Sequence, residues 1–248
     1  MAERFYSPNA ASTAPSITLD GDEARHLTRV RRVEVGEIVE IFDGRNFATR
    51  AEVFAIGKDR VELRAVGDPL PQRNAPCFVS LATAVPKGDR FDWLVEKATE
   101  LGVGRIIPIL TDRSTVDPRA SKLDRLRRTV IEASKQCGRN RLMTIDEPIR
   151  LAKILGSLMG PRLLCHPSGS PFPAGLKASE IAAVHLAIGP EGGFSEEEVV
   201  AAQNAGWTIM GLGETLLRVE TAGIVACARV LAVAESSGIS KGGTTDDV

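Results

Sequence analysis

Apolar and polar residues alternate in short runs over about the first 70 positions of the chain. A period of two is typical of β-strands that bury one face. The pairs Asp43-Gly44 and Lys58-Asp59 interrupt the pattern as turns. We therefore expect a small antiparallel β-barrel, with strands over residues 16–19, 38–42, 47–54 and 60–66.

A short helix is expected between the first two of these strands, over residues 21–32. It carries four arginines: Arg25, Arg29, Arg31 and Arg32. After the last strand, residues 67–76 are rich in proline and polar side chains, which favours a linker. The pattern thus predicts one domain over residues 1–72 and a second over residues 73–248.

Beyond the linker, longer helical segments alternate with apolar runs. This rhythm is typical of an α/β fold with a parallel sheet. Strands are expected over residues 78–84, 105–110, 162–166, 183–188 and 208–212, and helices over residues 91–101, 122–136, 196–205 and 221–235. The end of the chain, residues 236–248, has the glycine, threonine and aspartate content of a flexible tail.

Two glycine-rich stretches, residues 188–195 and 211–221, each follow an expected strand. Glycine lets a bare backbone approach a ligand closely, and parallel α/β sheets bind ligands at the carboxyl ends of their strands. Together the stretches predict one small-molecule pocket, whereas either stretch alone is also compatible with a tight turn. Ser195 and Glu198 fit the capping-box pattern, so we expect a helix to begin directly after the first stretch.

The kind of ligand is narrowed by what the first glycine stretch lacks. It has neither the Lys-Ser/Thr pair of a P-loop nor the glycine spacing of a dinucleotide-binding loop. A nucleoside triphosphate or NAD is therefore disfavoured. A ligand bound mainly by the backbone, such as an adenosine, remains.

Composition indicates a soluble globular protein, with 248 residues of which 43% are hydrophobic and 25% charged. The four cysteines are far apart and form no CxxC pair, which favours reduced thiols over a zinc site or a disulfide framework. No apolar run approaches the ~20 residues of a membrane helix, and the first residues lack the features of a signal peptide. We expect a cytoplasmic protein that does not contact a membrane.

Charge is distributed unevenly, although the formal net charge is only -1. From Arg105 to Arg141 there are ten Lys or Arg and four Asp or Glu, whereas residues 180–248 hold three basic and ten acidic residues. A chain segregated in this way can present a basic face to a polyanion. The alternative is a solvated helix surface.

The loop that follows the expected helix at residues 122–136 has side chains suited to RNA. Arginines bind phosphates and stack on bases, and amide side chains can bond to base edges. We expect an RNA-facing loop, with a solvated loop as the alternative. The residues concerned are Gln136, Arg139, Asn140 and Arg141.

Arg218 and Glu220 flank a valine just before the last expected helix. In an extended stretch both side chains point to one side. Beside a glycine-lined pocket, such a pair predicts substrate orientation or charge stabilisation. The alternative is a surface ion pair worth at most ~1 kcal/mol.

The three histidines, His26, His166 and His185, have no metal-ligand spacing, and no acidic cluster in the sequence completes a metal site. We expect no metal. His185 lies in a buried strand pattern and is expected to be a core histidine. His166, which precedes Pro167 at a strand end, is expected to line the pocket.

Five segments, taken together and in this order, closely resemble the RsmE family, the 16S ribosomal RNA (uracil(1498)-N(3))-methyltransferases. They are residues 26–32, 96–102, 136–141, 188–193 and 212–222. The resemblance covers nearly the whole chain. It implies an amino-terminal PUA-like barrel for RNA, in which Arg25, Arg29, Arg31 and Arg32 are expected to bind the RNA. It also implies a carboxy-terminal SPOUT domain, whose trefoil knot binds S-adenosylmethionine. It also implies a homodimer that acts on 16S rRNA or the small ribosomal subunit.

If the reaction is methylation of uracil N3, its chemistry suggests candidate roles for individual residues. Glu220 or, less favoured, Glu191 is the candidate base that removes the proton of uracil N3, and Arg218 stabilises charge on the uracil oxygens. A methyltransferase that acts on a tRNA base or a ribose 2'-hydroxyl is an alternative, as is a noncatalytic RNA-binding assembly protein. The residues expected around the cofactor are His166, Pro167, Ile188, Gly189, Pro190, Glu191, Gly193, Leu212, Gly213, Leu216, Leu217 and Arg218.

Overall fold

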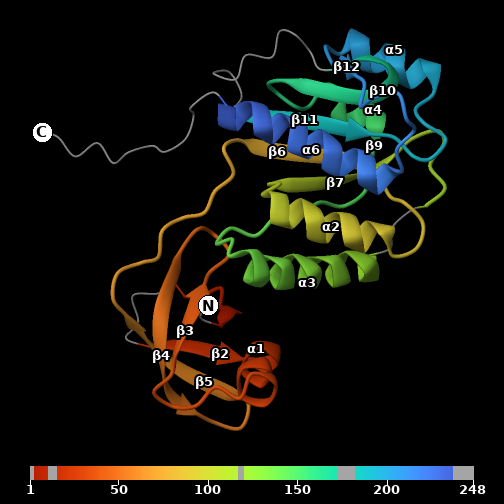
Figure 1. Ribbon diagram of the computed structural model, residues 1–248. Helices are drawn as coiled ribbons and strands as arrows, with labels where there is room; N and C mark the ends of the chain where they lie inside the picture. The colour runs from red at the N-terminus through yellow and green to blue at the C-terminus, as the bar shows by residue number, and fades with distance from the viewer. Residues whose placement is uncertain (1–2, 11–15, 117–119, 172–181, 237–248) are drawn as a thin grey trace, which may run out of the picture. The chain divides into compact units, whose positions relative to one another are not determined.

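The computed structural model describes residues 3–10, 16–116, 120–171 and 182–236, and the side chains of 120–122 are not described. The chain divides into two compact units (Figure 1). Unit 1 holds Met1–Asn74 and Ile131–Leu142, and unit 2 holds Ala75–Val130 and Met143–Val248. The expected boundary between residues 72 and 73 lies close to Asn74, where the first segment of unit 1 ends, and residues 131–142 also group with unit 1. The expected tail lies, apart from Ser236, outside the described residues.

Unit 1 is built on one five-stranded sheet with the order β1-β3-β4-β5-β2. The strands are β1 (Arg4–Tyr6), β2 (Ile17–Asp20), β3 (Ile38–Phe42), β4 (Ala48–Ile56) and β5 (Arg60–Val66). All neighbours are antiparallel except β1 and β3, which pair in parallel. Among the described residues, no strand pair joins β1 to β2. The sheet is thus mixed rather than antiparallel throughout, because the unexpected strand β1 joins it in parallel.

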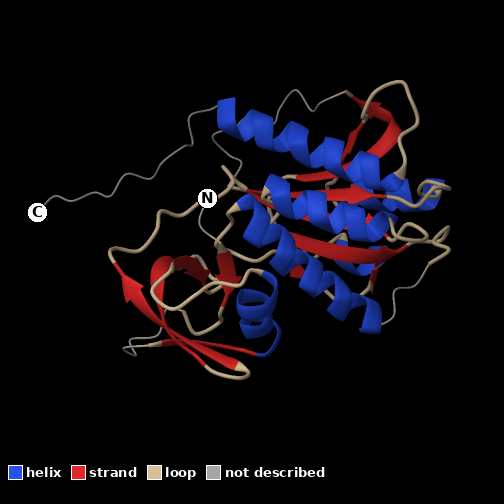
Figure 2. Ribbon diagram, turned by 60° about the horizontal axis from the view of Figure 1, so that its bottom comes forward, coloured by secondary structure: helices blue, strands red, loops and turns tan. Residues whose placement is uncertain are grey.

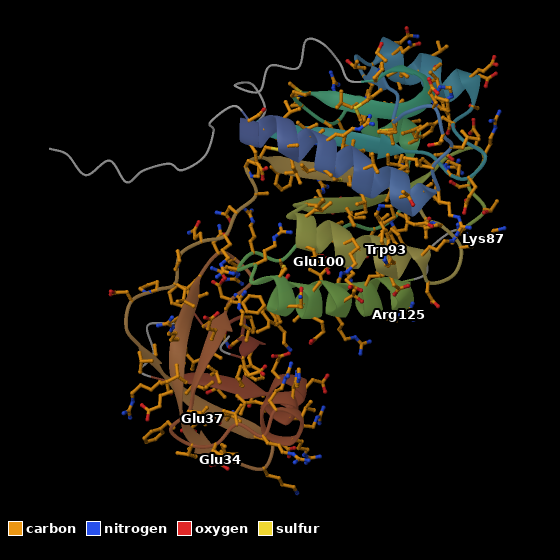
Figure 3. The ribbon with its side chains drawn as sticks, viewed as in Figure 1. Glu34, Glu37, Lys87, Trp93, Glu100 and Arg125 are labelled. Atoms are coloured by element: carbon orange, nitrogen blue, oxygen red, sulfur yellow. The ribbon has the colours of Figure 1, made fainter. Side chains whose placement is uncertain are left out.

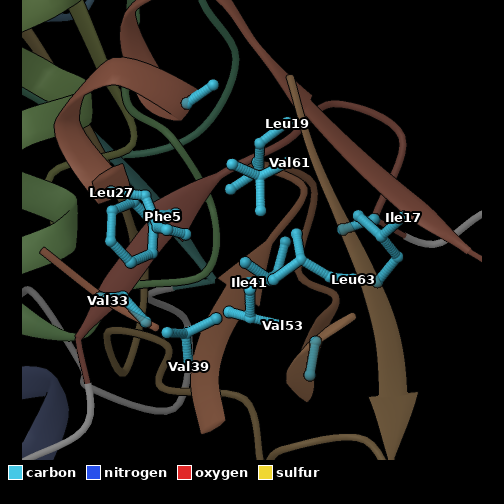
Figure 4. Packing of buried hydrophobic residues seen from close by; sticks show 13 residues of the cluster. Phe5, Ile17, Leu19, Leu27, Val33, Val39, Ile41, Val53, Val61 and Leu63 are labelled. Atoms are coloured by element: carbon cyan, nitrogen blue, oxygen red, sulfur yellow. The ribbon is translucent and has the colours of Figure 1, made fainter. Parts of the chain in front are cut away.

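The core of unit 1 follows from the alternation in the sequence. Val39 and Ile41 of β3, and Val61 and Leu63 of β5, are fully buried, whereas the residues between them face outward or are half-buried. Figure 4 shows these side chains packed with others of the same cluster, Phe5 of β1 among them. The arginine-bearing segment forms α1 (Gly21–Arg25) and a short π-helix, η1 (His26–Val30), which adds Leu27 to the core.

Unit 2 is an α/β layer around a parallel sheet with the order β12-β10-β11-β6-β7-β8, in which β9 also pairs with β7. Every pair in this sheet is parallel, as expected. The strands are β6 (Phe78–Ala84), β7 (Arg105–Leu110), β8 (Thr144–Ile145), β9 (Ile149–Arg150), β10 (Arg162–Ser170), β11 (Ala183–Ile188) and β12 (Thr208–Met210). The helices are α2 (Arg90–Leu101), α4 (Leu151–Ile154), α5 (Glu196–Asn204) and α6 (Val219–Ser236), and α3 (Ala120–Cys137) runs from unit 2 into unit 1.

The central strands of unit 2, β6, β7 and β11, are buried on both faces. Helices α2 and α6 run side by side, and α6 packs on β6 and β11 (Figures 1 and 2). A separate cluster contains Ala82 and Ile107 from the strands, together with Phe194, Ala202 and Trp207. Sheets buried on both faces read as continuous apolar runs, which is the pattern of these strands. None of the described helices is long and apolar enough to cross a membrane.

Candidate active site

A cavity of about 590 Å³ lies at the carboxyl ends of β10 and β11 in unit 2. Its walls come from the end of β10, from residues 188–194 after β11, and from residues 212–219 between β12 and α6. All twelve residues expected around the cofactor line this one cavity. Arg113 and Ala222 line it as well. A volume of this size suits a nucleoside-sized ligand.

The two glycine stretches meet the end of β10 at the cavity. Strand β10 is irregular there: Cys165 and Ser170 both align with Met210 of β12, so residues 166–169 are extruded from the pairing. Gly211 N donates to Ser170 O at 2.8 Å. This extrusion places His166 and Pro167 in the wall of the cavity. The expected strands therefore differ here, since β10 runs to Ser170 and β12 ends at Met210.

Arg229 of α6 fixes the loop between β12 and α6 through hydrogen bonds to its backbone. Its guanidinium donates to the carbonyls of Gly211 at 3.2 Å, Leu212 at 3.0 Å and Pro171 at 3.2 Å. A loop without regular pairing otherwise leaves these carbonyls to solvent. One side chain thus holds the loop that forms a wall of the cavity.

The loop after β11 is fixed by residues that follow β7. Arg113 Nη1 donates to Gly192 O at 2.8 Å, and Asp112 accepts from Ser195 Oγ at 3.0 Å. Ser195 also caps α5 in the expected capping box with Glu198. Sequence reasoning missed Arg113. The available signal was its position just beyond an expected strand, at the edge of the sheet where ligands bind.

Arg218 and Glu220 do not share one side, so that expectation is wrong. Helix α6 begins at Val219, two residues earlier than expected, and Ala222 N donates to Arg218 O at 2.8 Å in its first turn. Arg218 is exposed and lines the cavity. Glu220 is 7% exposed and is not among the lining residues. A helical turn separates side chains that an extended stretch would align.

Glu220 and Glu191 are instead joined by a residue that the sequence did not single out. Arg90, the first residue of α2, lies 3.1 Å from Glu191 Oε1 and 3.8 Å from Glu220 Oε2. Glu191 is exposed and lines the cavity. Both candidate bases are therefore tied to one guanidinium.

Two cysteines and one histidine of unit 2, Cys165, Cys227 and His185, have shifted pKa values because they are buried. Burial raises the pKa of the Cys165 thiol to about 12, and burial also raises the pKa of Cys227. His185 is buried, and its pKa is lowered chiefly by desolvation and further by Arg105 and Arg162, against a hydrogen bond to Met159 O. It is the core histidine that the strand pattern indicated.

The expected RNA-binding residues all lie in unit 1. Arg29, Arg32, Gln136 and Arg141 are exposed. Arg25 pairs with Asp22, and Arg31 pairs with Glu3 at 3.1 Å, so these two are partly engaged within the unit. Arg139 is half-buried, and burial lowers its pKa.

Asn140 does not face RNA as expected. Its side chain is 3% exposed, its Oδ1 accepts from Arg4 Nη2 at 2.7 Å, and its Nδ2 donates to Pro71 O at 3.4 Å. The amide therefore fixes the loop within unit 1 instead of presenting an edge to a base. The sequence could not reveal this, because Pro71 and Arg4, the partners of Asn140, lie 69 and 136 residues away in the chain.

One group in the described residues has the composition of a metal site: Glu23, His26 and Glu132 of unit 1. In the sequence only Glu23 lies close to His26, and Glu132 joins the pair from α3, which is distant in the chain. The ammonium of Lys135 sits among them, 2.9 Å from each carboxylate and 3.2 Å from His26 Nδ1. An ammonium here supplies the positive charge that the carboxylates need.

The chain matches known RNA methyltransferases over both of its parts. Residues 73–231 match the model of an RNA methyltransferase domain, and residues 19–66 match that of an RNA methyltransferase PUA domain. The chain therefore belongs to the RNA methyltransferase family. Within it, the chain is similar to Ribosomal RNA small subunit methyltransferase E of Synechocystis, with 34% identity over 95% of this chain and 79% of the relative.

The chain is also similar to solved structures of methyltransferases. A methyltransferase E from Neisseria gonorrhoeae, bound to S-adenosyl methionine, is 29% identical with a TM-score of 0.87 and covers 94% of this chain and 98% of its own. A putative methyltransferase from Legionella pneumophila, in complex with the cofactor SAM, is 31% identical with a TM-score of 0.86 and the same coverage. The α/β fold with a parallel sheet is thus that of these methyltransferases.

Proposed function

We propose that the protein transfers a methyl group from S-adenosylmethionine to N3 of a uracil in the 16S rRNA of the small ribosomal subunit. The observation that carries the proposal is the cavity between the two glycine stretches, with Arg218 and Glu191 in its wall. The family and the SAM-bound relatives support this choice of chemistry.

The residues of the cavity fit the cofactor. Ile188, Leu212 and Leu217 offer apolar surface to a purine, and the backbone of the glycine stretches offers hydrogen-bonding groups. The backbone of Gly189 lies close to the Phe194 ring, because a Cβ on Gly189 would be 3.1 Å from that ring. When bound, S-adenosylmethionine supplies an activated methyl group on its sulfonium, so the reaction needs no metal.

In this reaction, residues of the protein remove the proton of uracil N3 and stabilise the resulting negative charge. Uracil N3 holds its proton far above neutral pH, so a base must remove it or the anion must be stabilised. Glu220 is the candidate base and Glu191 the second candidate, while the exposed guanidinium of Arg218 stabilises charge on the uracil oxygens. Orientation of the uracil supplies a further part of the rate.

The RNA-binding surface is proposed for unit 1. Arg29, Arg32 and Arg141 are its primary phosphate-binding residues, because they are exposed and no ion pair within the described residues engages them. Gln136 is exposed at the end of α3, where it can contact a base. Phosphate contacts of this kind supply affinity without sequence preference.

Finer features of the fold and assembly are part of the proposal. A trefoil knot at the cavity is included on the resemblance to the RsmE family alone, and the sheet of unit 1 supports a PUA-like barrel. A homodimer is included in the proposal on the resemblance to the RsmE family alone. Four free thiols support a cytoplasmic protein.

The Glu220→Gln variant tests the reaction directly. Single-turnover methyl transfer is measured with the matched control Glu235→Gln, which changes an exposed carboxylate on the same helix. We expect the Glu220 variant to lose about a hundredfold or more in rate, the scale typical of a general base, and the control to keep its rate. An unchanged rate in E220Q excludes Glu220 as the base. Calorimetry with S-adenosylmethionine separates the enzyme from a noncatalytic RNA-binding protein, which would not bind the cofactor.

A further inference from the structure

All three nitrogens of the Arg90 guanidinium are directed at acceptors on different segments of unit 2. Nε donates to Lys87 O at 3.1 Å, in the loop between β6 and α2. Nη2 lies 3.1 Å from Glu191 Oε1, in the loop after β11, and Nη1 lies 3.8 Å from Glu220 Oε2, in the first turn of α6. A planar guanidinium can bridge groups in this way because its donors diverge in fixed directions.

The Glu220 carboxylate depends on this bridge more than Glu191 does. The side chain of Glu220 is 10% exposed, against 41% for Glu191. Within the described part of the chain, Glu220 Oε2 is buried and accepts no hydrogen bond. A buried carboxylate needs a compensating cation, and Arg90 and the amino-terminal end of α6 supply the positive charge.

We propose that Arg90 is a positioning residue for methyl transfer: it holds Glu220 in place beside the cavity and ties it, through Glu191, to the cofactor-binding loop. This inference rests on the proposed function. Arg90 does not line the cavity, so it acts through the two carboxylates rather than on the substrate. Its removal should therefore affect the reaction more than cofactor binding.

The test compares Arg90→Ala, Glu220→Gln and the double variant in single-turnover methyl transfer, with calorimetry of S-adenosylmethionine. We expect R90A to slow transfer by about tenfold or more while the cofactor Kd changes by less than about threefold. Because the two residues act as a unit, the double variant should be no slower than E220Q. Arg90→Lys keeps the charge with one nitrogen and should recover part of the rate.

The matched control is Arg125→Ala. Arg125 pairs with Asp92 at 2.6 Å and with Asp89 at 3.7 Å, near the same end of α2 (Figure 3). Its side chain is 56% exposed and lies outside the cavity lining, so we expect no change in rate. Surface pairs of this kind contribute little.

Amide hydrogen exchange gives a readout that needs no methyl transfer. We expect exchange over residues 189–194 and in the first turn of α6 to be faster in R90A than in the wild type or R125A. The positioning role is overturned if exchange there is unchanged, or if R90A slows E220Q as much as it slows the wild type. A wild-type protein that binds the cofactor but methylates no RNA would instead overturn the proposed function, and exchange would still test the bridge.

Discussion

Gly169 at the end of β10 and Gly211 after β12 lie backbone against backbone at the cavity. A Cβ on Gly211 would lie 2.5 Å from Gly169 O, and a Cβ on Gly169 would lie 2.5 Å from Met210 C. Neither position leaves room for a side chain, since both obstacles are backbone atoms. The glycine requirement at these positions is therefore steric, and it keeps the two segments close enough to shape one pocket.

Replacing Gly211 with alanine is expected to force the two segments apart. We predict a loss of about 1–3 kcal/mol in the free energy of unfolding, as for other overpacked sites, and loss of S-adenosylmethionine binding. Gly156→Ala is the control, because a Cβ there meets nothing within 4 Å. Urea unfolding and calorimetry measure both effects. Equal stability and cofactor affinity in G211A and G156A would contradict the steric account.

Removal of the Arg113 side chain should loosen the loop after β11. Arg113→Ala loses the hydrogen bond to Gly192 O and part of the cavity wall. We expect cofactor affinity to fall about tenfold, which corresponds to ~1.4 kcal/mol. The control is Lys153→Ala, an exposed cation on α4 outside the lining. If calorimetry gives the same Kd for both variants, the loop does not depend on Arg113.

At Arg32, the contribution of the charge to RNA binding can be measured separately from the effect of the backbone conformation on stability. Its φ is 54°, in the left-handed region that favours glycine. Arg32→Gly should therefore keep or raise stability while it weakens RNA binding and reduces the slope of log K against log salt by about one. The control is Arg60→Ala, which removes another exposed arginine of unit 1. Alanine is used instead of glycine because Arg60 lies in β5, where a glycine would also weaken the strand. An unchanged salt slope in R32G would remove Arg32 from the RNA-binding surface.

The buried histidine predicts how stability depends on pH. The carbonyl of Met159 can only accept, so Nε2 of His185 carries the proton, and Nδ1 has no partner within the described residues. The pKa of His185 is lower in the folded protein than in the unfolded chain. Below the ordinary pKa of about 6.5, the unfolded chain therefore binds a proton that the folded protein does not. Stability from this residue is present above that pH and falls as the pH drops toward the folded pKa. His185→Gln should show a shallower loss of urea stability between pH 7 and pH 5, and parallel curves would contradict this.

Much of the fold could be predicted because each signal was local. Strand β6 and the capping box of Ser195 are where apolar runs and cap residues place them. Strand β1 was missed because three residues carry no measurable alternation. The membership of residues 131–142 in unit 1 was missed because α3 is a continuous helix in the sequence, and only its tertiary contacts divide it.

The site was predicted where glycine and position define it, and missed where ion pairs do. The residues around the cavity follow strands at the carboxyl edge of a parallel sheet, which sequence periodicity reveals. Arg90 and Arg113 are single arginines whose partners in the loop after β11 lie 79 or more residues away, so the local sequence does not show these contacts. The only signal was the position of Arg113 just beyond an expected strand. The start of α6 also moved Glu220 into the interior, since a two-residue shift of a helix boundary redirects every side chain after it.

The identity of the methylated nucleoside tests the central claim most directly. Small ribosomal subunits that lack the modification, and the corresponding naked rRNA and tRNA, are incubated with the protein and methyl-labelled S-adenosylmethionine. The RNA is then digested to nucleosides, which are separated and identified by mass spectrometry. We predict label in 3-methyluridine from the small-subunit RNA. Label in a ribose 2'-O-methyl nucleoside or only in tRNA, or no label in any RNA, would contradict the account.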